Sequence, residues 1–173
     1  MRRFSDAGLT LLELLVVVAV VLIIAALAAP RLLRARTAAN ETSAIAAMRA
    51  ISTAEDMYAK ECGQGGFAAS LQTLGIAPPG TSAPFLSANL TGSPNPQSDG
   101  YTFTIAAGNG STPGPNDCNG TATVSTYYVT AVPLTLGTTG TRSFASNPAH
   151  TIWQLTGANA PTEPFAAPAT PIQ

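Results

Sequence analysis

The longest apolar run of the chain lies within its first thirty residues. Between Leu9 and Pro30 the only charged residue is Glu13, and the seventeen residues from Leu14 to Pro30 carry no charge. A helix needs about twenty apolar residues to cross the hydrocarbon core of a bilayer. The pattern therefore predicts a membrane-spanning helix over residues 9–30, with a carboxylate near its start that such a helix does not need.

A second helical pattern follows from Arg31 to Glu61. This stretch is rich in Ala, Arg, Glu and Met and contains no Gly or Pro, a composition that favours helix. Its apolar positions recur at three- and four-residue steps and define one face, formed by Ile45, Met48, Ile51, Ala54 or Glu55, and Tyr58. We expect one long helix, bent at Pro30 and ended by the glycines at 63, 65 and 66. We expect its charges, Glu41 among them, to lie mostly off that face.

Beyond these glycines the pattern changes from helical to strand-like. A short helix is expected within residues 67–75, followed by a Pro-punctuated loop. Four runs have the composition or alternation of strands: Tyr101–Ala107, Thr121–Val132, Thr141–Ser146 and His150–Leu155. Turn residues between them suit an antiparallel meander. The predicted fold class is α+β, a long N-terminal helix packed on a small antiparallel β-sheet, with a Pro- and Ala-rich tail that we expect to be poorly ordered.

Charge divides the chain into a charged front and a nearly neutral back. The 173 residues include 8 basic and 9 acidic side chains, and the formal net charge is -1. All basic residues except Arg142 lie at or before Lys60, and only Asp99 and Asp117 are charged between Cys62 and Thr141. No basic stripe of the kind that binds nucleic acid is visible, so no nucleic-acid partner is expected.

Three interpretations of the apolar run compete. A cleaved signal peptide has an apolar region of about 7–15 residues, which is shorter than this run, although AALAAP at residues 25–30 resembles a cleavage site. A single-span anchor fits the length, and Arg2 and Arg3 would keep its N-terminus in the cytoplasm. Glu13 fits neither, because a charge inside the hydrocarbon costs roughly 2.5–3.5 kcal/mol, and less near the end of the span.

The third interpretation rests on the segment GLTLLELLVVVAVVLIIAALAAP, which resembles the N-terminal processing segment of type IV pilins and of type II secretion pseudopilins. The resemblance implies that a prepilin peptidase cleaves after Gly8 and that the new amine of Leu9 is methylated. Thr10 and Glu13 then stand second and fifth in the mature chain. Pro30 stands where the family has its helix-kinking proline. Leu9 replaces the usual Phe of the family and keeps that position apolar.

The resemblance also implies a partner for Glu13. In the family this carboxylate is credited with pairing to the N-terminal amine of the next subunit in a filament. The physics agrees, because two charges that are costly apart in an apolar medium attract strongly when they are brought together. The alternative is a carboxylate that snorkels to the headgroups and needs no protein partner.

The remaining chemistry of the chain is sparse. Cys62 and Cys118 form either one disulfide, in an oxidising compartment, or two unrelated buried thiols, and we expect the disulfide. Their spacing matches no metal site, and the acidic residues of the back half are far apart, so no metal or other cofactor is expected. The single histidine, His150, belongs to no catalytic motif, and the chain is not expected to be an enzyme.

The patterns and the resemblance together divide the chain into five parts. The resemblance implies a leader peptide (1–8) and a transmembrane and filament-core helix (9–30), and the patterns add the amphipathic half of the long helix (31–61), a globular sheet domain (62–157) and a Pro/Ala-rich tail (158–173). The predicted function is that of a structural subunit of a bacterial type IV pilus-like filament. It would be made as a single-pass inner-membrane prepilin and then enter a periplasmic or extracellular filament. Its expected partners are copies of itself, prepilin peptidase, the pilus or type II secretion assembly machinery and the inner membrane. The alternatives are a type II secretion pseudopilin, a single-span membrane protein that never polymerises, and a secreted enzyme.

Overall fold

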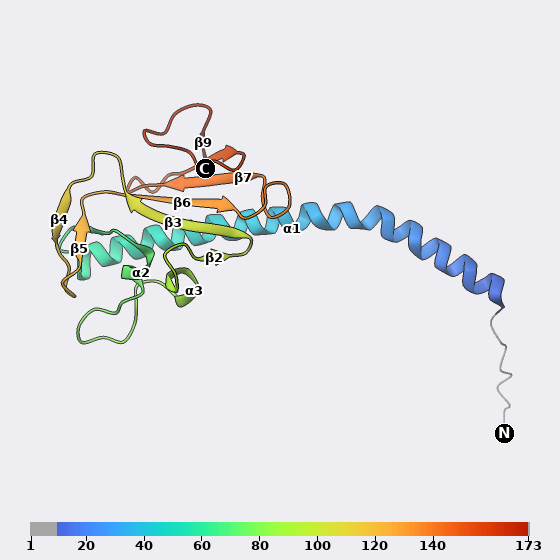
Figure 1. Cartoon of the computed structure of the whole chain (residues 1–173), viewed down its shortest axis with the longest axis horizontal. Coiled ribbons are helices and arrows are strands. Elements are labelled where there is room, and N and C mark those ends of the chain that lie inside the picture. The colour runs from blue at the N-terminus through green and yellow to red at the C-terminus, as the bar shows by residue number, and fades with distance from the viewer. Residues whose placement is uncertain (1–9, 173) are drawn as a thin grey trace, which may run out of the picture. The chain divides into compact units, whose positions relative to one another are not determined.

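The computed structural model describes residues 10–172, apart from the side chains at positions 27, 29 and 30, and shows a long helix and two β-sheets (Figure 1). Helix α1 (Leu11–Glu61) covers both helical patterns of the sequence. The chain forms two compact units, residues 1–36 and 37–173, and α1 contributes to both. The α1 backbone stays helical through Pro30, and the bend expected at that residue remains a prediction.

Helix α1 ends where the sequence becomes rich in glycine. The N–H of Gly63 donates to the carbonyl of Tyr58 at 2.7 Å, and the N–H of Gly65 donates to that of Ala59 at 2.9 Å. Gln64 and Gly65 have φ values of 52° and 90°, in the left-handed region that commonly terminates helices. The glycine signal in the sequence therefore predicted the end of the helix correctly.

The main sheet has six antiparallel strands in the order β2-β3-β6-β7-β8-β9. Their bounds are Gln97–Ser98 for β2, Tyr101–Ala107 for β3, Tyr127–Pro133 for β6, Arg142–Ser146 for β7, Ile152–Thr156 for β8 and Thr170–Ile172 for β9. A second sheet has the order β1-β5-β4, with β1 Phe67–Ala68, β5 Ala122–Val124 and β4 Pro113–Asn116. The short helices α2 (Leu71–Leu74) and α3 (Ala88–Thr91) lie between β1 and β2 in the chain. The main sheet is the predicted meander, interrupted by the excursion that forms β4 and β5.

The hydrophobic core of the second unit lies between one face of α1 and the main sheet (Figure 1). The helix contributes Ala44, Met48, Ile51, Ala54 and Tyr58, and the sheet contributes Tyr101, Phe103, Tyr127, Val129, Ala131, Phe144 and Ile152. Burying one large apolar side chain of this kind stabilises a fold by about 1.5–3 kcal/mol. The helical face predicted from the sequence is therefore the face that holds the sheet.

Glu41 corrects one prediction about that face. Its side chain was expected off the buried face, but the residue is only 5% exposed. The prediction was wrong because Thr141, in the turn before β7, and Arg142, the first residue of β7, supply donors to the carboxylate. A carboxylate can be buried when another element provides its partners.

The predicted disorder of the Pro- and Ala-rich tail is also wrong. The tail ends in β9, which pairs with β8 as the last strand of the main sheet. Phe165 stacks on Trp153 with ring centroids 5.4 Å apart, and the hydroxyl of Tyr128 donates to the carbonyl of Pro161. These contacts join residues far apart in the sequence, and composition alone does not reveal them.

Candidate processing and assembly site

The start of α1 is capped by Thr10. The Thr10 hydroxyl accepts a hydrogen bond from the N–H of Glu13 at 3.2 Å, and its carbonyl accepts from the N–H of Leu14 at 3.1 Å. Thr10 is therefore the N-cap, and Glu13 occupies the third helical position, in the first turn. A Thr and a Glu at this spacing are the two members of a capping box. The T-x-x-E spacing in the sequence carries this capping signal in addition to the two motif positions.

A carboxylate in the first turn also interacts favourably with the helix itself. The first N–H groups of a helix have no partner within it and carry a partial positive charge. Glu13 is exposed at this position. Its negative charge stabilises the helix start within one subunit and leaves the carboxylate accessible to a second positive group.

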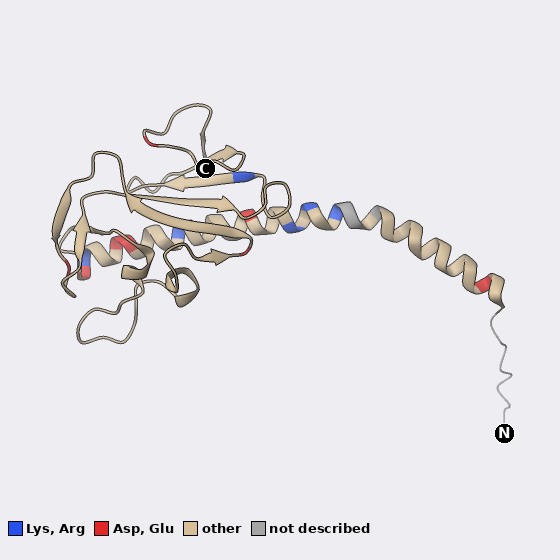
Figure 2. Ribbon diagram, viewed as in Figure 1, with Lys and Arg blue, Asp and Glu red and all other residues tan. Residues whose placement is uncertain are grey.

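The helix beyond Glu13 presents an apolar surface to its surroundings. No charged residue lies between Glu13 and Arg31, so one end of α1 is uncharged over many turns (Figure 2). Its leucine, isoleucine and valine side chains from residue 11 to residue 24 are exposed. By length and composition α1 can cross a membrane, and the apolar window that would do so is not buried. Arg31, Arg34 and Arg36 follow it and are exposed as well.

The structure describes only part of the predicted site. Gly8 and Leu9, the residues of the expected cleavage, lie outside the described residues, as does the leader of residues 1–8. Thr10 and Glu13 lie together at the helix start. Pro30 lies within α1, and nothing in the structure tests its predicted role.

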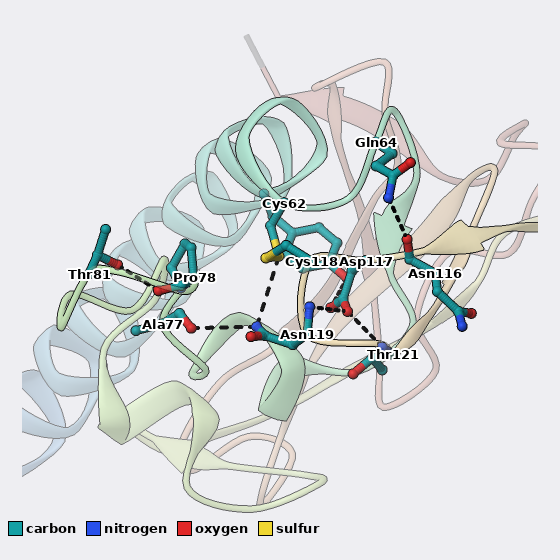
Figure 3. Close-up of a disulfide and its surroundings, with 11 residues drawn as sticks. Cys62, Gln64, Ala77, Pro78, Thr81, Asn116, Asp117, Cys118, Asn119 and Thr121 are labelled. Carbon is teal, nitrogen blue, oxygen red and sulfur yellow. Dashed lines mark hydrogen bonds between the residues drawn. A yellow bond between two sulfur atoms is a disulfide. The ribbon is translucent and has the colours of Figure 1, made fainter.

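Cys62 and Cys118 lie in the second unit, where the structure joins them by a disulfide (Figure 3). The bridge links the residue just after α1 to the loop between β4 and β5. The backbone reinforces it, because the N–H of Cys118 donates to the carbonyl of Cys62 at 2.9 Å. The side-chain amide of Gln64 donates to the carbonyl of Asn116 at 3.0 Å, beside the bridge (Figure 3).

The loop that carries Cys118 is organised by Asp117. One oxygen of this carboxylate accepts from the N–H groups of Asn119 and Thr121, at 2.9 and 2.6 Å (Figure 3). The other oxygen accepts from the hydroxyl of Tyr58 at 2.8 Å. Burial and this hydrogen bond to a carboxylate raise the pKa of the Tyr58 hydroxyl well above its ordinary value. Asp117 is thus engaged by protein donors and ties the loop to α1.

Glu41 forms the opposite attachment of α1 to the sheet. Its Oε1 accepts from the N–H and the hydroxyl of Thr141, at 2.8 and 2.7 Å, and its Oε2 accepts from the guanidinium of Arg142. Burial would raise the pKa of Glu41, but these hydrogen bonds and the charge of Arg142 outweigh it and hold the pKa below its usual range. The carboxylate therefore stays ionised and fixes the start of β7 on the helix.

Glu55 is the second buried carboxyl group of α1. Its Oε2 accepts from the N–H of Ala68 at 2.8 Å, while Oε1 has no hydrogen-bond partner within residues 10–172. Burial raises the pKa of Glu55 to about 8. The helical spacing of the sequence fits either Ala54 or Glu55 at this step of the buried face, and both residues are buried.

The other ionisable groups of the second unit are dispersed. Glu163 accepts from the side-chain amide of Asn147 at 2.6 Å, and His150 lies at the surface with Nε2 3.3 Å from a carboxylate oxygen of Asp56. Within the part of the chain that the structure describes, no three His, Cys, Asp or Glu residues gather where they could hold a metal ion.

The N-terminal segment, including the start of α1, matches a known family of sequence motifs. Residues 3–29 match the family described as the prokaryotic N-terminal methylation motif. The match includes both the expected cleavage position and the Thr10–Glu13 cap. No curated protein and no solved structure matches the chain. The motif is the signature of type IV pilins and pseudopilins, so the chain carries the N-terminal segment of a pilin-like precursor. A long N-terminal helix with antiparallel sheets is consistent with a pilin-like fold.

Proposed function

We propose that the protein is a structural subunit of a type IV pilus-like filament, made as a prepilin anchored in the inner membrane. The N-terminal methylation motif supports this function, as does the position of Glu13 in the first turn of an apolar, exposed helix. In the precursor that helix is the membrane anchor, with the leader in the cytoplasm. After a prepilin peptidase has cut behind Gly8, the same apolar surface packs against copies of the helix in a filament.

The role of Glu13 follows from where its charge lies. An apolar surface alone lets two helices slide past each other with little change in energy. A carboxylate on one helix and the amine of Leu9 on the next attract most strongly in one relative position, and the apolar surroundings strengthen that attraction. Glu13 thereby sets the register of the filament. Pseudopilins share this motif, so a type II secretion filament is the alternative within the same class.

The test compares Glu13→Ala with the wild type in the native host. We expect the variant to reach the membrane at the wild-type level or above, because a charge leaves the apolar segment. Cleavage behind Gly8 should persist. Filament assembly should fail, because each interface would leave a buried amine without its partner, a loss of about 3–5 kcal/mol where the pair is desolvated. The measurement is the yield of sheared filaments beside the amount in the membrane fraction.

Glu61→Ala is the matched control, because it removes an exposed carboxylate from the other end of the same helix. It should leave filament yield unchanged. If the protein is a membrane protein that never polymerises, neither variant should differ from the wild type in this assay. Equal filament yields from Glu13→Ala and the wild type would show that this carboxylate is not there for assembly.

A further inference from the structure

The loop between β6 and β7, residues 134–141, exposes two leucines. Leu134 is 46% exposed and Leu136 is 51% exposed. The loop sequence LTLGTTGT carries no charge, and its other side chains are threonine hydroxyls. Exposed leucines close together on an uncharged loop suit an environment that is apolar on one side and hydrogen-bonding on the other. The interface between the acyl chains and the headgroups of a bilayer is such an environment.

This β6–β7 loop is held against the first turn of the second unit. The hydroxyl of Thr37 donates to the carbonyl of Thr138 at 3.1 Å, and the side-chain amide of Asn40 donates to that of Thr139 at 2.9 Å. The next residue of the helix, Glu41, accepts from the N–H of Thr141. Three contacts from one helical turn therefore fix the position of the loop.

The loop is also rigid in itself. The N–H of Thr139 donates to the carbonyl of Thr135 at 2.9 Å, and the N–H of Gly137 donates to that of Gly140 at 2.8 Å. Any side chain at Gly140 would collide with the hydroxyl of Tyr101. The leucines are therefore presented by a preformed turn, and little conformational entropy is lost when they enter an apolar medium.

The membrane lies within reach of this loop. Thr37 follows Pro30, the last residue of the apolar run, by seven residues. Seven residues span about 10 Å as a helix and at most roughly 25 Å when fully extended. Whatever path they take, Thr37 lies within that distance of the end of the apolar run, and the loop is bound to Thr37.

We propose that the β6–β7 loop inserts Leu134 and Leu136 into the interfacial region of the membrane that anchors the same chain. The inference rests on the proposed membrane-anchored precursor and goes beyond it, because it assigns a lipid contact to the globular unit. The neighbouring turn carries the exposed Asp99, next to Gly100, whose carbonyl accepts from the N–H of Leu134. Asp99 disfavours anionic headgroups, whereas the exposed Arg31, Arg34 and Arg36 favour them. A zwitterionic surface removes both effects and isolates the contribution of the leucines.

The test uses the full chain in nanodiscs of phosphatidylcholine with brominated acyl chains, which quench nearby tryptophan fluorescence. Trp153→Phe removes the single tryptophan, and Leu136→Trp then places a new one on the loop. Ile76→Trp is the matched control. Ile76 is 48% exposed and adjoins Ala77, whose carbonyl accepts from Asn119 beside the disulfide, at the far end of the domain's helix.

We expect quenching of Leu136→Trp to exceed that of Ile76→Trp by about twofold or more, because the loop would lie at the depth of the headgroup and acyl boundary. Leu134→Trp should behave like Leu136→Trp, which guards against a local effect of one substitution. An excess of discs keeps one chain in each disc. Quenching of the loop positions that appears only with several chains per disc would overturn the proposal in favour of an arrangement that needs a second copy.

Equal quenching of the loop and control positions, in chains that have entered the discs, would overturn the lipid contact alone. Failure of every variant to enter the discs would overturn the membrane anchor, and the lipid contact with it. Recovery of the chain with the discs separates the two outcomes.

Discussion

A carboxyl group that is buried without a cationic partner favours its neutral form, and Glu55 is such a group. Only one of its two oxygens accepts a hydrogen bond within the described residues, and burial raises its pKa to about 8. In the unfolded chain the pKa returns to its ordinary value near 4.5. The folded protein therefore holds a proton, between these two pH values, that the unfolded protein has released.

This difference predicts how stability depends on pH. The contribution of Glu55 to the free energy of unfolding is fully present below pH 4.5 and is lost as the pH rises towards 8, by at most about 1.4 kcal/mol per pH unit. Glu55→Gln removes this slope and keeps an oxygen for the N–H of Ala68. Denaturant unfolding of the full chain in detergent, from pH 5 to pH 8, should show the wild type losing stability relative to the variant.

Glu61→Gln serves as the control for that titration, because it neutralises an exposed carboxyl group on the same helix. It should reproduce the wild-type slope. The contribution of Glu41 to the pH dependence of stability has the opposite sign. Because the pKa of Glu41 is lowered in the folded protein, the stability it contributes is lost as the pH falls. An identical pH dependence for the wild type and Glu55→Gln would mean that Glu55 is ionised in the folded protein.

At the scale of elements, the disulfide joins the end of α1 to the β4–β5 loop across 56 residues of sequence. In the chain-entropy description, closing a loop of this length stabilises the fold by about 4 kcal/mol. The double variant Cys62→Ala/Cys118→Ala should lower the free energy of unfolding by up to that amount, measured by denaturant titration. Thiol labelling of the unfolded, unreduced wild type should find no reactive thiol. Two labelled cysteines would contradict the bridge.

The elements that the sequence predicted well are those whose signal is local. Strand β3 has the bounds that alternation gave it, because Tyr101 and Phe103 are buried in the core and the alternating Thr102 and Thr104 are not. The end of α1 was readable from its glycines. The long run expected over Thr121–Val132 is instead two strands, β5 and β6, because the chain passes from one sheet to the other within it.

The elements that were missed depend on partners distant in sequence. Strand β4 has the sequence PGPN, which indicates a turn. It is possible because β4 is an edge strand, and a proline there needs no partner for a missing N–H. The burial of Glu41 depends on Arg142, 101 residues away, and β9 depends on β8. Local periodicity carries no information about such pairs, whereas the N-terminal motif is contiguous and was readable in full.

At the scale of the whole molecule, the first event we expect is cleavage between Gly8 and Leu9, followed by methylation of Leu9. Mass spectrometry of protein purified from the native host should find a methylated N-terminus at Leu9. Gly8→Val should retain the leader, because a prepilin peptidase reads the glycine at that position. An intact N-terminus in the wild type, or a cut near Ala28, would contradict the prediction.

The contact between Glu41 and the turn before β7 determines how early the domain can fold during synthesis. Glu41 and Thr141 are 100 residues apart, and ribosomes add about 5–20 residues each second. The carboxylate therefore exists for roughly 5–20 s before its binding partners are synthesised. During that interval the buried face of α1 has no sheet to cover it, and the domain cannot close. A chain that stays open while it is being made can still be threaded through a translocation channel, as the proposed membrane-anchored precursor requires.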